Sequence, residues 1–130
     1  MIRRADLDQV ISVAEQHGFR YRHAGDIDML LYGDTNSAKN AIHLLFSGEK
    51  VKDSYLEPAP EVCPVEVNLY GATFRVIPVA DLVKMKLTAN RDKDRVHVRG
   101  MDAAGLLTPE VEATLPAELR ARLQVTRETE

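Results

Sequence analysis

One stretch decides the fold: residues 76–95 read VIPVADLVKMKLTANRDKDR. It begins as the end of a strand and breaks at Pro78, whose fixed φ and missing N–H suit the start of a helix. Asp81 then lies in the first turn, where the helix dipole favours a negative charge. Asn90 tolerates the left-handed conformation that ends many helices, so an amphipathic helix is expected between Pro78 and Asn90. Its apolar positions are Val79, Leu82, Val83, Met85, Leu87 and Ala89.

Downstream of this helix, apolar spacing and helix-start signals predict three more helices. Thr108 followed by Pro109 fits a cap and a first helical position, and Pro116 starts the last helix. The first of the three carries Val96, Val98, Met101, Ala104 and Leu107, and the last carries Leu119 and Leu123.

Upstream, the pattern predicts one helix followed by strands. Asp6 caps a helix that Gly18 ends. Alternation of apolar and polar residues predicts strands over residues 19–24, 27–32, 42–46, 65–69 and 72–77. Gly25 and Asp26 form a turn, so the first two strands are expected to make an antiparallel hairpin. The proline-containing residues 49–64 are typical of an extended surface loop.

Composition is that of a single globular domain. The chain has 130 residues, 45% of them apolar, and a net charge of −3. The slightly negative charge argues against nucleic acid as a partner. Apolar runs are too short to cross a bilayer, and the N-terminus does not read as a signal peptide, so a cytoplasmic location without a membrane partner is expected. Cys63 is the only cysteine, which excludes an internal disulfide.

These elements predict an α+β fold, with a small mixed β-sheet and helices packed on one side of it. We expect one domain over residues 1–130. Residues 1–78 would be mainly sheet with the N-terminal helix, and residues 79–125 would be the helical part.

The run LVKMKLTANRDKDR over residues 82–95, followed by residues 98–107, resembles the C-terminal helical part of the nucleotidyltransferase-like superfamily. The likeness is to AbiEii-type proteins and uncharacterised bacterial relatives, and FRVIPV at residues 74–79 resembles the strand that leads into that helix. The resemblance runs from Asp6 to about Leu107. It implies a truncated nucleotidyltransferase-like fold.

In active members of that superfamily, a Gly-Gly or Gly-Ser loop holds the triphosphate, and an Asp-x-Asp pair on the next strand binds Mg²⁺. On its predicted strands this chain has one such pair, Asp26 and Asp28. No Gly-Ser precedes it, and the next strand offers His43 where a third carboxylate would be sought. In the register of the resemblance, residues 6–17 match the helix after the metal strand, so the metal-binding segment would lie before Met1.

Two readings of the aspartate pair follow. In the first, Asp26 is a turn residue, Asp28 is an exposed strand residue, and the protein needs no cofactor. In the alternative, Asp26 and Asp28 hold Mg²⁺ and are catalytic. His23 and His43 could face each other across adjacent strands, but two histidines without a third ligand are a weak metal signal.

The basic residues of the quoted stretch also have two interpretations. Lys86, Lys84, Arg91 and Lys93 resemble positions that approach nucleotide phosphates in active relatives, and Lys86 is the best single candidate because it shares a helix face with apolar residues. The alternative is a solvated helix face on which nearby aspartates such as Asp94 form weak local pairs.

The first functional hypothesis is therefore a non-catalytic nucleotidyltransferase-like protein that acts as a binding or interaction module and binds nucleotide weakly or a partner chain. The alternative is an active metal-dependent nucleotidyltransferase that moves a nucleoside monophosphate from a triphosphate to an acceptor. A third class is an antitoxin-like or regulatory partner.

Without the first helix and strand of the parent fold, a sheet edge and a helix face would lose their cover, so a two-fold homodimer is expected.

Overall fold

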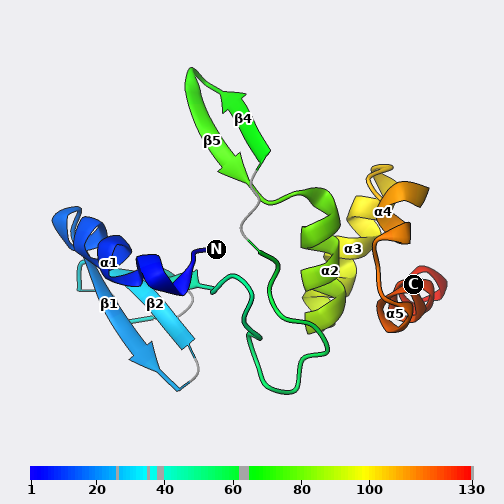
Figure 1. Ribbon diagram of the computed structural model, residues 1–130, viewed down its shortest axis with the longest axis horizontal. Coiled ribbons are helices and arrows are strands. Elements are labelled where there is room, and N and C mark those ends of the chain that lie inside the picture. The colour runs from blue at the N-terminus through cyan, green and yellow to red at the C-terminus, as the bar shows by residue number, and fades with distance from the viewer. Residues whose placement is uncertain (26, 35, 38–39, 62–64, 130) are drawn as a thin grey trace. The chain divides into compact units, whose positions relative to one another are not determined.

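The computed structural model describes the chain except for residues 26, 35, 38–39, 62–64 and 130 (Figure 1). Asp26 and Cys63, which the sequence singled out, therefore lie outside the described residues. The chain divides into two compact units, Met1–Val62 and Cys63–Glu130, and each is described by itself. The expectation that both belong to one domain stays a prediction.

In its described residues, the first unit is a three-stranded antiparallel sheet with the α-helix α1 beside it. Its elements in chain order are the short 3-10 helix η1 (Arg4–Asp6), α1 (Leu7–Gln16), β1 (Phe19–Ala24), β2 (Ile27–Tyr32) and β3 (Ile42–Leu44). The strand order is β1-β2-β3. Gly18, with a φ of +87°, ends α1 as predicted and leads directly into β1. The buried apolar residues of this unit are Met29, Leu30, Leu31, Phe46 and Ala59.

The end of the first unit is held by backbone pairs outside the sheet. The third strand stops at Leu44 instead of residue 46, because the chain there turns to pair with the N-terminal segment. The Ile2 N–H donates to the Leu45 carbonyl over 2.9 Å. Further on, the Gly48 N–H donates to the Ala59 carbonyl over 2.9 Å, and the Ala59 N–H donates to the Glu49 carbonyl over 2.8 Å. These two bonds close the segment between them into a surface loop.

The described residues of the second unit form a β-hairpin and four helices. They are β4 (Val65–Leu69), β5 (Ala72–Val76), α2 (Val79–Ala89), α3 (Asp92–Ala103), α4 (Pro109–Ala113) and α5 (Ala117–Glu128). The capping signals lie where the sequence predicted them. Asn90 has a φ of 50° and ends α2, and the Thr108 hydroxyl accepts from the Val111 N–H at the start of α4.

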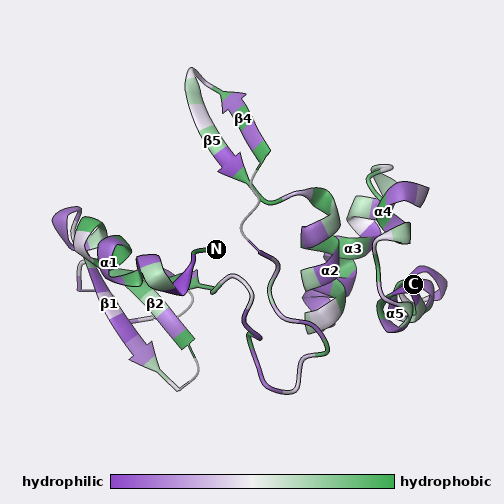
Figure 2. Ribbon diagram, in the orientation of Figure 1, coloured by the Kyte–Doolittle hydropathy of each residue, from purple (hydrophilic) through white to green (hydrophobic). Residues whose placement is uncertain are grey.

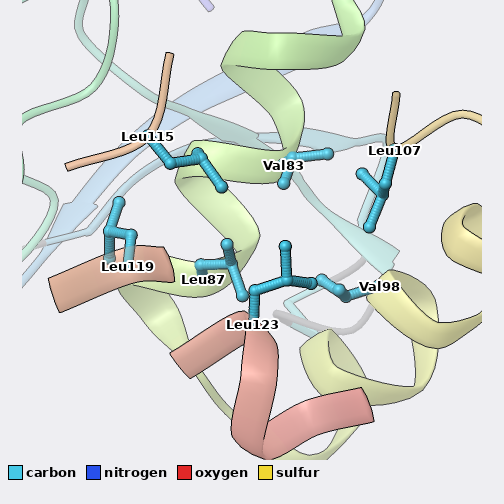
Figure 3. Packing of buried hydrophobic residues seen from close by; sticks show 7 residues of the cluster. All are labelled: Val83, Leu87, Val98, Leu107, Leu115, Leu119 and Leu123. Atoms are coloured by element: carbon cyan, nitrogen blue, oxygen red, sulfur yellow. The ribbon is translucent and has the colours of Figure 1, made fainter. Parts of the chain in front are cut away.

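The four helices share one hydrophobic core, in which side chains from α2, α3, α5 and the two segments flanking α4 point toward one another (Figure 3). Its members are Val83, Leu87, Val98, Leu107, Leu115, Leu119 and Leu123. Full burial of one such leucine contributes about 1.5–3 kcal/mol, so this cluster is the main stabilising element of the helices. Arg122 adds a polar link, because its Nη1 donates to the carbonyls of Leu87 and Thr88 at the C-terminal end of α2.

The predicted α+β class is confirmed. The expected single mixed sheet is corrected: the strands form two separate antiparallel sheets, β1-β2-β3 and β4-β5. The physical reason is local, because β4 and β5 are joined by the two-residue turn Tyr70-Gly71 and pair with each other. Among the helices of the described residues, none has the length and apolar character of a membrane span.

Candidate functional site

Asp28 on β2 is the centre of a polar cluster that includes two side chains of β1. The Tyr21 hydroxyl donates a short hydrogen bond to Asp28 Oδ1, and His23 Nδ1 lies 2.9 Å from the same oxygen. Only 7% of Asp28 is exposed. The reading of Asp28 as an exposed strand residue is therefore wrong, because its carboxylate lies against side chains of the neighbouring strand.

The register of the first hairpin explains this cluster. His23 lies directly opposite Asp28, and Tyr21 lies opposite Leu30. Because side chains alternate between the two faces of a strand, Tyr21, His23 and Asp28 share one face of the sheet. The sequence contained the signal, since the predicted hairpin places Ala24 opposite Ile27 and so sets this register. Alternation within a single strand does not give this pairing, so Tyr21 and His23 were not predicted as partners of Asp28.

The electrostatics of the cluster favour a charged carboxylate. Burial acts to raise the pKa of Asp28, but hydrogen bonds from Tyr21 and His23, together with the positive charge of Arg4, outweigh it and lower the pKa below its usual value. The hydrogen bond to Asp28 raises the pKa of Tyr21. Arg4 is itself held by two hydrogen bonds to Glu49, of 2.7 and 3.0 Å, and stacks 3.9 Å from the centre of the Phe46 ring.

The structure does not bring His23 and His43 together. β2 lies between β1 and β3, so His23 and His43 are not on adjacent strands, and the idea that they face each other is wrong. His43 is opposite Met29, whose side chain is on the other face from Asp28. In the part of the chain that the structure describes, no three histidine, cysteine, aspartate or glutamate side chains form a group able to hold a metal ion.

Lys86, the leading phosphate candidate, lies in a second polar cluster between α2 and α3. Its Nζ is 3.2 Å from Asp94 Oδ1 and 3.0 Å from His97 Nδ1. Asp94 also accepts from Arg91, whose Nε is 2.7 Å away and whose backbone N–H is 3.2 Å away. The Asp94 side chain is only 1% exposed. Asp94 thus joins two of the basic candidates and is buried, whereas the sequence suggested a weak pair on a solvated helix face.

The electrostatics of this second cluster again favour the ionised acid. Burial acts to raise the pKa of Asp94, and the hydrogen bonds from Arg91 and Lys86 lower it below its usual value. Of the other two phosphate candidates, Lys84 is half-buried on α2 and Lys93 is exposed on α3. A role of Lys86, Lys84, Arg91 or Lys93 in phosphate binding stays a prediction.

The third feature is the hairpin of β4 and β5, which has one apolar and one polar face. The cross-strand pairs of the apolar face are Val65 with Val76, Val67 with Phe74, and Leu69 with Ala72. The other face pairs Glu66 with Arg75 and Asn68 with Thr73, whose hydroxyl donates to Asn68 Oδ1 over 2.8 Å. Figure 2 shows the resulting alternation of hydrophobic and hydrophilic residues along both strands. The apolar face is largely exposed.

An open groove lies between α1 and the face of the first sheet that carries Phe19 and Leu30. Its volume is about 450 Å³, and its lining is mostly apolar: Gln9, Val10, Val13, Ala14, His17, Phe19 and Leu30. His17, one of these lining residues, already has a partner nearby, because its Nδ1 lies 2.9 Å from the Val13 carbonyl oxygen.

Comparisons with protein-family models, with curated proteins and with solved structures found no match for this chain. The resemblance to nucleotidyltransferases stays a prediction drawn from residues 6–107.

Proposed function

We propose that the chain is a non-catalytic relative of the nucleotidyltransferase-like superfamily that works as an interaction module. One observation supports this most strongly: Asp28 and Lys86, the leading candidates for metal and phosphate among the described residues, are already bound to other side chains. Asp28 Oδ1 holds Tyr21 and His23, and Lys86 holds Asp94 and His97.

Displacing these partners would cost free energy. A cation at Asp28 Oδ1 has to displace hydrogen bonds to a charged acceptor, which contribute about 1.5–3 kcal/mol each. A phosphate at Lys86 has to compete with a buried carboxylate, and breaking one partner from a buried ion pair costs about 3–5 kcal/mol. Both positions therefore favour their present partners over a weakly held nucleotide.

A thermal-unfolding titration tests the proposal. Mg-ATP and Mg-GTP are added separately to the full chain, with MgCl₂ alone as the control. A ligand that binds the native state at about 100 times its Kd stabilises it by about 2.7 kcal/mol and raises the unfolding midpoint. We expect no nucleotide-dependent rise that requires Asp28.

Two variants separate the outcomes. A rise that Asp28→Asn abolishes would support the alternative, an active metal-dependent enzyme with Mg²⁺ at Asp28, and would overturn the proposal. A small rise that Lys86→Gln abolishes and Asp28→Asn does not would fit a binding module that holds nucleotide weakly through its phosphates.

A further inference from the structure

We propose that Lys86 is a site of covalent acylation, at which its amine takes an acyl group from a small thioester and His97 acts as the base. This inference goes beyond the proposed function, because it needs neither a nucleotide nor a partner chain. It rests on contacts between α2 and α3 within the second unit, where Lys86 Nζ lies 3.2 Å from Asp94 Oδ1 and 3.0 Å from His97 Nδ1.

The first argument concerns the balance of charge at Asp94. Two cations, Lys86 and Arg91, bind this one carboxylate, with N–O distances of 3.2 and 2.7 Å. A single negative charge neutralises only one of them, and an arginine keeps its proton in proteins. A neighbouring positive charge is one of the ways in which a lysine amine is activated as a nucleophile. Lys86 is therefore the cation of this pair that can give up a proton.

The second argument identifies the group that takes the proton. A protonated lysine can only donate, so the 3.0 Å contact requires His97 Nδ1 to accept with its lone pair. The imidazole is then neutral, and its lone pair is already directed at a proton of Nζ. A nucleophile and a base within about 2.6–3.2 Å of each other are the recurring arrangement of nucleophilic catalysis. The pair of Lys86 and His97 has this arrangement.

The third argument selects the electrophile from the protonation states of the same groups. Asp94 is ionised, because its pKa is lowered in spite of its burial, and His97 Nδ1 begins as an acceptor. Neither group can therefore supply a proton to a leaving alcohol or amine. A thiolate leaves without one, since thiols ionise at about pH 8–9. These contacts favour a thioester over an ester or an amide.

The reaction balances with these groups. His97 takes one proton from Nζ and passes it to water, and Nζ then attacks the carbonyl carbon of the thioester. A C–N bond forms, the C–S bond breaks, and the leaving thiolate takes the second proton that the new amide nitrogen releases. The products are an acyl-lysine and a free thiol, and His97 is again neutral.

The acylated product also fits the cluster, because Asp94 keeps its other donors. Acylation removes the charge of Lys86 and leaves one N–H on Nζ. The Asp94 carboxylate still accepts from Arg91 through Nε at 2.7 Å, Nη2 at 3.3 Å and the backbone N–H at 3.2 Å. A buried carboxylate destabilises a fold when it loses its partners, so the corner between α2 and α3 should tolerate this modification.

Competition between lysines of the same chain tests the inference. The full chain is treated with S-acetyl-N-acetylcysteamine, a small thioester without a nucleotide, and mass spectrometry of peptides follows acetylation at each lysine. The Lys86 side chain is only 24% exposed, whereas Lys52 is exposed on the loop of the first unit. Accessibility alone favours Lys52. We expect Lys86 to react at least about tenfold faster than Lys52, and any smaller ratio would overturn the inference.

Two histidine variants test the role of the base. His97→Gln keeps an acceptor but removes the base, so acetylation at Lys86 should fall at least about tenfold. His17→Gln is the matched control and should leave the rate at Lys86 unchanged, because His17 contacts the Val13 carbonyl instead. In the wild type, the ratio of Lys86 to Lys52 should also fall between about pH 8 and pH 5, where histidine side chains take up a proton.

Equal rates at Lys86 in the wild type and in His97→Gln, with both folded by circular dichroism, would overturn the role of His97. A wild-type ratio that does not change with pH would do the same. If His97→Gln does not fold, the wild-type ratio and its pH profile decide the question, since neither needs a variant.

Discussion

Lys86 of α2 and Asp94 of α3 form an ion pair across the turn at Asn90, with Nζ 3.2 Å from Oδ1. The same carboxylate accepts the Arg91 backbone N–H and so completes the capping box at the start of α3. One buried acid thus fixes the α2–α3 corner and pairs with Lys86 and Arg91, two of the four basic residues that the sequence suggested for phosphate.

We expect Asp94→Ala to lower the free energy of unfolding of the helical part by about 2–4 kcal/mol, because it removes a cap and the carboxylate that pairs with Lys86. Asp92→Ala is the control, since Asp92 lies in the same turn but is 97% exposed. It should cost no more than about 1 kcal/mol. Urea unfolding followed by circular dichroism measures both, and equal costs would contradict the central role of Asp94.

Asp94 also predicts how the stability of the folded chain changes at low pH. The pKa of Asp94 is lower in the folded chain than its usual value of 3.8, so the folded state favours the ionised form. Its contribution is fully present above pH 3.8 and is lost as the pH falls through the lower folded value. Urea midpoints measured down this pH range should fall less steeply for Asp94→Asn than for wild type, and parallel curves would argue against the shift.

The hydrophobic core of the helices predicts a loss of stability that does not depend on charge. Leu119 on α5 is fully buried, and Leu119→Ala should destabilise the chain by about 2–5 kcal/mol through lost burial and a cavity. Val125→Ala on the same helix is the control, because Val125 is 59% exposed and should change stability by less than about 1 kcal/mol. The two are compared by chemical denaturation at neutral pH, where a similar loss in both would contradict the assigned core.

A spectroscopic prediction concerns Tyr21. Its hydrogen bond to Asp28 raises its pKa above the usual value of 10.0, so its phenol should ionise late in an alkaline absorbance titration. Tyr21→Phe should remove that late step, and Asp28→Asn should shift it to lower pH. Tyr70→Phe, at the exposed tip of the second hairpin, should leave the late step in place. A titration unchanged by Asp28→Asn would contradict the contact.

The helices of the second unit could be predicted because their signals are local. Pro78, Asn90 and the Thr108-Pro109 pair each act through their own backbone conformation, and the structure places them at helix ends. The strand positions were predictable for the same reason. The separation of β4 and β5 from the first sheet was not, because nothing in a strand's own alternation says which neighbour it will pair with.

The candidate site was less predictable because burial is a tertiary property. Asp28 was expected to be exposed, yet the register of the first hairpin brings Tyr21 and His23 onto it. Lys86 was singled out for its helix face, but its partner Asp94 is buried only because α3 packs against α2. The contacts of Asp28 follow from the register of a predicted hairpin. The contact of Lys86 with Asp94 depends on how two helices pack, which the sequence pattern does not give.

The backbone pairs of Gly48 and Glu49 with Ala59 offer a place to label the protein. These backbone hydrogen bonds close the base of the loop over residues 49–59 and do not involve its tip, where Asp53 and Ser54 are exposed. Since doubling the length of a flexible loop costs only about 0.6 kcal/mol, an epitope tag or a fluorescent domain spliced between these two residues should leave the sheet intact. The chain can then be tracked in cells while both of its termini remain native.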